Sequence, residues 1–207
     1  SVFTFIETRI NSRKLTRIER MPIDRDTVSL VLFDNSATAV FENRRLYRSE
    51  ELLHEMMRHS AGGGTDFAKG IKCASNLIEK YRDPLKVNLI IFLSDGMGTL
   101  PEKELRDLCQ LETDLGTYLY TVKFTGNSGD YLSNFVFWST KPSNPLEEMV
   151  MIANKYLPKC SDEDSLKCKY VLAIDEIELI THFTQVAESL RKHKPTLMRN
   201  CEEYARN

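Results

Sequence analysis

The sequence predicts an α/β protein: a Rossmann-like three-layer sandwich with a mostly parallel sheet, one antiparallel edge strand, and helices on both faces. Short apolar or β-branched segments alternate with amphipathic segments along most of the 207 residues. Segment 87–93, VNLIIFL, is apolar at nearly every position, which is typical of a strand covered by helices on both faces. Hydrophobic residues make up 42% of the chain and charged residues 28%, a composition that suits one domain with a sizeable core.

The first half of the chain alternates between strand and helix patterns. Segments 27–33 and 37–42 are rich in β-branched residues, and the turn sequence DNS between them favours a hairpin. Segment 49–59 has apolar residues at helical spacing, and Ser49 can cap it. The expected elements are a helix that includes residues 2–10 and ends before Pro22, strands 27–33 and 37–42, a helix at 49–59 with Leu52, Leu53, Met56 and Met57 on one face, and a helix that begins at Phe67 and ends before Pro84. The expected apolar face of this last helix comprises Ala68, Ile71, Ala74, Ile78 and Tyr81.

The second half continues the alternation. Segment 101–111 predicts a helix because Pro101 suits a first turn and acidic residues lie near the start. Segment 130–143 fits no regular pattern. The expected elements are strand 87–93, helix 101–111, strand 117–124, helix 145–157, strand 169–174 and helix 175–193. We expect one domain at residues 1–193 and a charged tail at 194–207.

Charge and cysteine content exclude several classes of protein. The formal net charge of −2 gives no global field that would favour nucleic acid or an anionic membrane. No apolar run is long enough to cross a bilayer, so membrane insertion is not expected. The five cysteines are widely spaced and form no C-x-x-C pair, which argues against a zinc site. Reduced thiols in the cytoplasm are the simplest interpretation.

Two loops carry residues that could form a functional site. One is Gly62–Gly64 followed by Thr65 and Asp66, at the start of a helix. The other is Ser94–Gly96, directly after the apolar strand 87–93, which we expect to be the central strand. In open parallel sheets, ligands bind beyond the carboxyl ends of the strands. The hydroxyl of Thr65 and the carboxylate of Asp95 are hard oxygen ligands, which Mg²⁺ prefers. The pair therefore predicts part of a magnesium site.

Simpler explanations exist for both loops. Thr65 or Asp66 could cap the helix that begins at Phe67, and Asp95 could form an Asx turn with Gly96. A phosphate-binding loop is a further alternative for the glycines, but the chain has neither the Walker lysine pattern nor G-x-G-x-x-G. Ser94 has no histidine that the sequence places near it, so a turn role is expected for this serine as well.

Several stretches together resemble a von Willebrand factor type A domain, also called an integrin I-like domain. The matching stretches are DRDTVSLVLFDNSATAVF, GGGTDFAKGI, VNLIIFLSDGMG, TYLYTVKF, LEEMVMIANKY and VLAIDEIELITHFTQVAESL. The resemblance implies a protein-interaction module rather than an enzyme. It also implies that Thr65 and Asp95 belong to a metal-dependent adhesion site, where Mg²⁺ accepts a carboxylate from a protein partner. Asp66 would then support this site or cap the helix.

The chain departs from the family at its start. The family's first strand and its D-x-S-x-S metal loop are absent, and SVFTFIETRI resembles the later part of the helix that follows them. We therefore expect a split sheet, an incomplete metal site, and a fragment of a larger multidomain protein. Two alternatives remain open: a metal-free intracellular scaffold of the same fold, and a hydrolase or nucleotide-binding enzyme on the same architecture.

Overall fold

The fold is taken from a computed structural model, which describes residues 26–45, 49–59, 62–83, 86–111, 116–124, 144–157, 167–173, 175 and 177–190. The predicted helix that includes residues 2–10, the irregular segment 130–143 and the tail at 194–207 lie outside these residues. Residues 125–129 and most of segment 160–168, both of which the sequence predicts to be loops, also lie outside them.

The described elements follow the predicted order closely. No helix among them is long and apolar enough to span a membrane. The elements are β1 (Thr27–Phe33), β2 (Ala37–Arg45), α2 (Ser49–Met56), α3 (Phe67–Lys80), β3 (Asn88–Ser94), α4 (Glu102–Cys109), β4 (Thr117–Phe124), α5 (Pro145–Tyr156) and β5 (Lys169–Ala173), followed by a helix at 177–190.

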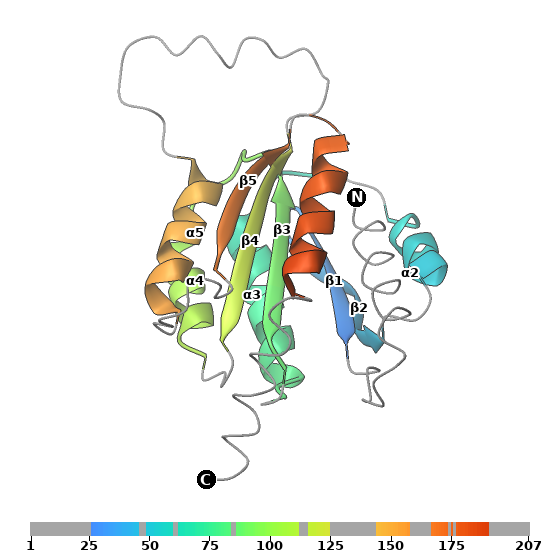
Figure 1. Cartoon of the computed structure of the whole chain (residues 1–207), viewed down its shortest axis with the longest axis horizontal. Coiled ribbons are helices and arrows are strands. Elements are labelled where there is room, and N and C mark those ends of the chain that lie inside the picture. The colour runs from blue at the N-terminus through green and yellow to red at the C-terminus, as the bar shows by residue number, and fades with distance from the viewer. Residues whose placement is uncertain are drawn as a thin grey trace.

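The strands form two separate sheets in the described residues (Figure 1). Strands β3, β4 and β5 are parallel and lie in that order, and β1 pairs with β2 as an antiparallel hairpin. The predicted hairpin is therefore confirmed, as is the predicted parallel arrangement. Among the described residues no ladder joins the antiparallel pair to β3, so the strands there form a split sheet, as expected.

The central strand of the parallel sheet is β4, whereas the sequence favoured β3. Five consecutive residues of β4 are buried, but β3 has one buried residue, Phe92, with the others half-buried. The reason is topological: β4 has neighbours on both sides, while β3 pairs with β4 alone among the described strands. Apolar content indicated coverage by helices but could not indicate the lateral neighbours.

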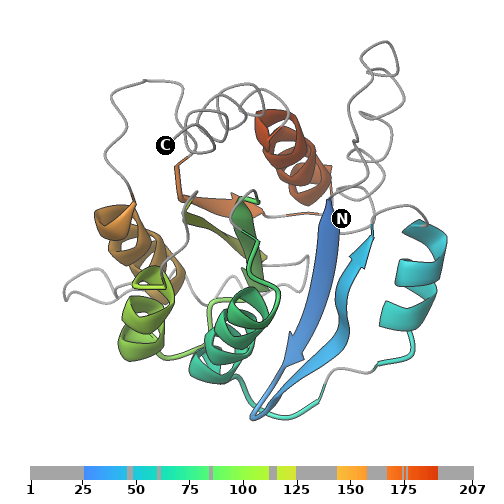
Figure 2. The same cartoon turned by 90° about the horizontal axis from the view of Figure 1, so that it is seen from below.

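Helices cover both faces of the parallel sheet (Figure 2). Phe92 of β3 and Leu119 of β4 pack against α3, α4 and α5 in the largest apolar cluster. On the opposite face, Val122 of β4 packs with Leu179 and Phe183 of the helix at 177–190. This arrangement confirms the predicted three-layer sandwich.

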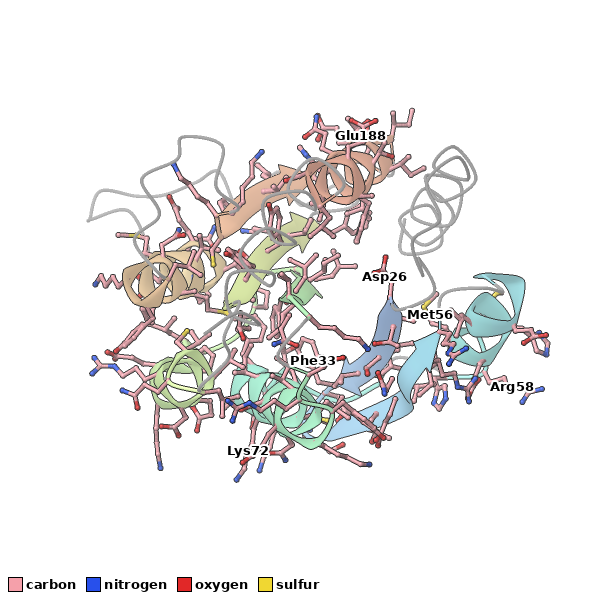
Figure 3. All side chains as sticks on the ribbon, turned by 60° about the horizontal axis from the view of Figure 1, so that its bottom comes forward. Asp26, Phe33, Met56, Arg58, Lys72 and Glu188 are labelled. Carbon is pink, nitrogen blue, oxygen red and sulfur yellow. The ribbon has the colours of Figure 1, made fainter. Side chains whose placement is uncertain are left out.

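Three phenylalanines connect the two sheets. Phe33 at the end of β1 stacks on Phe92 of β3, with ring centroids 4.9 Å apart. Phe67, the first residue of α3, meets both rings edge-on, at 6.1 Å from Phe33 and 5.1 Å from Phe92. In Figure 3, Phe33 lies between β1 and α3, while Lys72 points from α3 away from the sheet. Aromatic packing thus joins strands that share no hydrogen-bond ladder.

Two predicted apolar faces differ in detail. Helix α2 ends at Met56, so Met57 lies beyond the helix and its side chain is 74% exposed, although Leu52 is buried as expected. On α3 the buried residue of the last turns is Leu77, and Ile78 is only half-buried. Both differences arise because the direction of an apolar face depends on where the helix begins and ends.

We expect Phe67→Ala to lower the free energy of unfolding by about 3–5 kcal/mol, because this ring is buried and contacts both sheets. The matched control is Ile177→Ala, where the side chain is 74% exposed, and its effect should stay within about 0.5 kcal/mol. Urea denaturation of the two variants measures the difference. Equal midpoints for both variants would contradict the connecting role of Phe67.

Candidate functional site

The segments that directly follow the two predicted loops contact each other in the structure. The loop that holds Thr65 leads into α3, and the loop that holds Asp95 follows β3. A Cβ atom placed on Gly98 would lie 2.5 Å from Cε1 of Phe67, so the backbone of the second loop passes directly over this ring. The structure therefore brings the segments of Thr65 and Asp95 together.

A third loop joins them, and sequence reasoning treated it only as a turn. The backbone N–H of Asp66 donates to the carbonyl of Asp34 at 2.8 Å. Positions for a Cβ on Gly63 and Gly64 lie 3.4 Å and 2.5 Å from side-chain atoms of Asn35. The β1–β2 turn thus packs on the glycine loop. The sequence did contain a signal for this third loop, because Asp34 directly follows the apolar strand β1 just as Asp95 directly follows β3.

The helix cap separates the roles of Thr65 and Asp66. The Oδ1 atom of Asp66 accepts a hydrogen bond from the backbone N–H of Lys69 at 3.2 Å, so Asp66 is the N-cap of α3. The side chain of Thr65 is exposed, and within the described part of the chain its hydroxyl takes part in no hydrogen bond. The capping alternative therefore holds for Asp66 and leaves the Thr65 hydroxyl available.

Asp95 takes part in a turn. Its Oδ1 atom accepts hydrogen bonds from the backbone N–H of Met97 at 2.9 Å and from the Ser94 hydroxyl at 3.3 Å. The Ser94 hydroxyl in turn accepts the N–H of Gly96 at 3.2 Å, which confirms the predicted turn role of Ser94. These bonds fix the direction of the exposed Asp95 carboxylate, whose Oδ2 atom has no hydrogen bond among the described residues.

Asp34 is held in its ionised form by its own turn. Its Oδ1 atom accepts the backbone N–H of Ser36 at 2.7 Å and the Ser36 hydroxyl at 2.9 Å. The backbone hydrogen bond from Ser36, and then the hydroxyl bond, lower the pKa of Asp34 below its usual value. The turn therefore presents a fixed negative charge beside the glycine loop.

One cationic side chain also reaches this edge. Lys123 pairs in register with Ser94 across the parallel ladder between β3 and β4. Its Cε, Cδ and Nζ atoms lie 3.2, 3.3 and 3.6 Å from the position of a Cβ on Gly96. The lysine stem therefore lies over the Asp95–Gly96 turn. Sequence alone did not indicate this residue, because the strand register decides which side chain faces the loop.

The oxygen donors at this edge are of the chemical type that a hard divalent cation binds, but they are too few for a complete coordination shell. Thr65 contributes a hydroxyl and Asp95 a carboxylate, both of which suit Mg²⁺. In number they form only part of a coordination shell, and no cluster of three or more His, Cys, Asp or Glu side chains in the described residues could hold a metal ion by itself. Such a shell needs further oxygen donors from water, from a partner or from elsewhere in the protein.

The described thiols are poorly suited to nucleophilic chemistry. Burial raises the pKa of Cys109 to about 11, and it also raises the pKa values of Cys73 and Cys168. Cys168 additionally accepts the backbone N–H of Leu119 through its sulfur at 3.1 Å. These cysteines are free thiols that act as small packing residues.

The architecture defines a class of Rossmann-like α/β sandwich with loops gathered at the carboxyl edge of a parallel sheet. No protein-family model matches the sequence, and no curated protein matches it. Among solved structures, the chain is similar to a protein described as von Willebrand factor type A from Catenulispora acidiphila. The TM-score is 0.51 at 14% sequence identity, over 89% of this chain and 37% of that chain. The chain therefore has a von Willebrand factor type A-like fold, as the sequence predicted.

We expect Gly98→Ala to destabilise the protein by about 1–3 kcal/mol, because the new methyl group would overlap the buried Phe67 ring. Phe67→Leu removes the ring atoms nearest to that methyl group. In the Phe67→Leu background, Gly98→Ala should therefore cost less, which a double-mutant cycle of thermal unfolding measures. Purely additive effects would contradict the contact between the two loops.

We expect Ser36→Ala to raise the pKa of Asp34 part of the way towards its usual value, because the hydroxyl bond is lost while the backbone N–H bond remains. NMR titration of the Asp34 carboxyl carbon measures this change. Since the folded-state pKa of Asp34 is depressed, its ionised form contributes stability at neutral pH that is lost as pH falls below the usual value of 3.8. An unchanged pKa in the variant would contradict the turn geometry.

Proposed function

We propose that the chain is a protein-interaction module that binds its partner at the carboxyl edge of the sheet, through Mg²⁺ held by Thr65 and Asp95. The observation that carries this proposal is that Thr65 and Asp66, which precede α3, have different roles. Asp66 already caps the helix, so the exposed Thr65 hydroxyl is not needed for folding. A hydroxyl that folding does not use and a carboxylate that its turn orients are both oxygen donors of the kind that Mg²⁺ binds, which supports the proposal.

In this proposal each residue has a defined task. The turn bonds from Met97 and Ser94 orient the Asp95 carboxylate, and the packing of Gly98 on Phe67 holds its loop beside Thr65. When bound, Mg²⁺ would supply a charge that attracts a carboxylate of the partner. Met97, 76% exposed and between two glycines, would offer an apolar contact beside the polar site.

The main alternative is a metal-free scaffold of the same fold. One observation favours it: Oδ1 of Asp95 already accepts the N–H of Met97 at 2.9 Å, so the aspartate has a structural role without a cation. In that case Thr65 and Asp95 would shape the loops, and a partner would recognise the loop surface directly. The two functions differ in their response to metal.

The thiols also favour a binding function over catalysis. Burial raises the pKa values of the three described cysteines, which makes them poorly suited to act as nucleophiles. Free thiols on α3, on α4 and beside β5 suit a reducing intracellular compartment, which we propose for this module as part of a larger multidomain protein.

The metal component of the proposal predicts a cation-dependent rise in stability for the natural protein that contains this sequence. At a Mg²⁺ concentration ten times its dissociation constant, the rise should be about 1.4 kcal/mol, or a few degrees in Tm. Thr65→Ala and Asp95→Ala should abolish the rise, and EDTA should reverse it. Asp107→Ala, an exposed aspartate on α4, is the matched control and should keep it. An equal rise in Asp95→Ala and the unaltered protein would refute the metal component.

The interaction component is tested with a displayed random-peptide library, selected in MgCl₂ and counter-selected in EDTA. Enriched peptides should share an Asp or Glu, and they should lose binding to the Asp95→Ala variant. Enrichment that is independent of both Mg²⁺ and Asp95 would support the metal-free scaffold instead.

A further inference from the structure

Lys123 places a positive charge beside the candidate cation site. In a parallel ladder, residues in register point to the same face, so Lys123 and Ser94 share the face that carries Phe92, Thr121 and the helices α3 to α5. Two residues earlier on β4, Thr121 is fully buried and donates to the carbonyl of Leu146 at 2.8 Å. Lys123 is therefore the last residue of β4 with its side chain on this face, and it lies next to the loop that follows β3.

The lysine side chain lies along the turn rather than away from it. Its Cδ and Cε atoms lie 3.3 and 3.2 Å from the position of a Cβ on Gly96, and Nζ lies 3.6 Å from the same point. Gly96 adopts a φ of 86°, and it directly follows Asp95. A side chain at residue 96 would displace the lysine, so the glycine permits this close approach.

The ammonium group of Lys123 is not paired with another side chain in the described residues. Lys123 forms no ion pair or hydrogen bond there. By contrast, Lys80 on the same protein is paired with Glu42 at 2.6 Å, and Arg106 is paired with Glu102 on the surface of α4. The charge of Lys123 therefore acts on its immediate surroundings, which include Gly96, the residue that directly follows Asp95.

We propose that Lys123 is a built-in competitor for the cation at this edge: its ammonium partly neutralises Asp95 and lowers the affinity of the loops for divalent metal. The proposal depends on the proposed function only for the location of the metal at Asp95. It assigns a regulatory role to a residue on β4, outside both predicted loops. Metal would then occupy the edge only at high concentration, or when a partner carboxylate also binds Lys123 or the metal.

The size of the effect follows from Coulomb's law. At a fully solvent-exposed site, where the effective dielectric constant is about 80, a unit charge and a divalent cation about 6 Å apart repel by an amount equivalent to about a tenfold change in affinity. Salt screens such an interaction, with a Debye length of about 10 Å at 0.1 M. The competition should therefore weaken as ionic strength rises, whereas a change in loop packing would not depend on salt in this way.

The test uses the natural protein and Mn²⁺, whose free concentration is measured by electron paramagnetic resonance. Lys123→Met keeps the apolar stem over Gly96 and removes the charge, so it should bind Mn²⁺ about tenfold more tightly than the unaltered protein. Lys123→Arg keeps the charge and should bind as the unaltered protein does. Lys155→Met, an exposed lysine in the last turn of α5, is the matched control and should also leave affinity unchanged. Asp95→Asn should remove the site in each background.

The outcomes separate the two proposals. Equal Mn²⁺ affinity in Lys123→Met and the unaltered protein, with binding still lost in Asp95→Asn, would overturn the role of Lys123 and leave the proposed function intact. Absence of Asp95-dependent Mn²⁺ binding in every variant, including Lys123→Met, would overturn both. A tenfold gain that shrinks between 50 mM and 500 mM NaCl would support electrostatic competition, and a gain that is independent of salt would overturn it.

Discussion

The contact among Phe33, Phe67 and Phe92 is the constraint on which the rest of the structure depends. Each ring lies at or near the end of an element that leads into or out of the candidate site. Phe33 is the last residue of β1, Phe67 is the first residue of α3, and Phe92 lies two residues before the end of β3. Because the two sheets share no ladder in the described residues, these rings set their separation. They also set the position of the three loops, since Gly98 passes over the Phe67 ring.

The same few polar groups at this edge serve folding and would also serve the proposed binding. Asp66 is used by a helix cap, Asp34 by its turn with Ser36, and Asp95 by its turn with Met97. Each carboxylate satisfies backbone N–H groups that would otherwise lack partners in the protein. An aspartate in a turn keeps a second oxygen, so structural use of one oxygen does not prevent the other from binding a ligand.

Much of the fold could be predicted from sequence because the signals were local. Strand β1 was predicted at its observed bounds from the β-branched run 27–33, and β4 from 117–124. The candidate site was predictable only where chemistry and local sequence coincide, as in the loops of Thr65 and Asp95. The roles of Asp34 and Lys123 depend on how distant segments pack and on the register between β3 and β4, which no local pattern records. For the same reason, the central position of β4 could not be distinguished from that of β3.

The separation of the two sheets has a consequence for the behaviour of the chain at high concentration. In the described residues β3 has a strand neighbour on one side only, and so does β1. Segment 89–93 of β3 combines high β-propensity with an absence of charge and proline, which are the features of segments that form intermolecular ladders. The strand that leads into the Asp95 loop thus also has the features of a segment that recruits a second chain, so self-association and the proposed partner recognition would compete for neighbouring parts of the same strand.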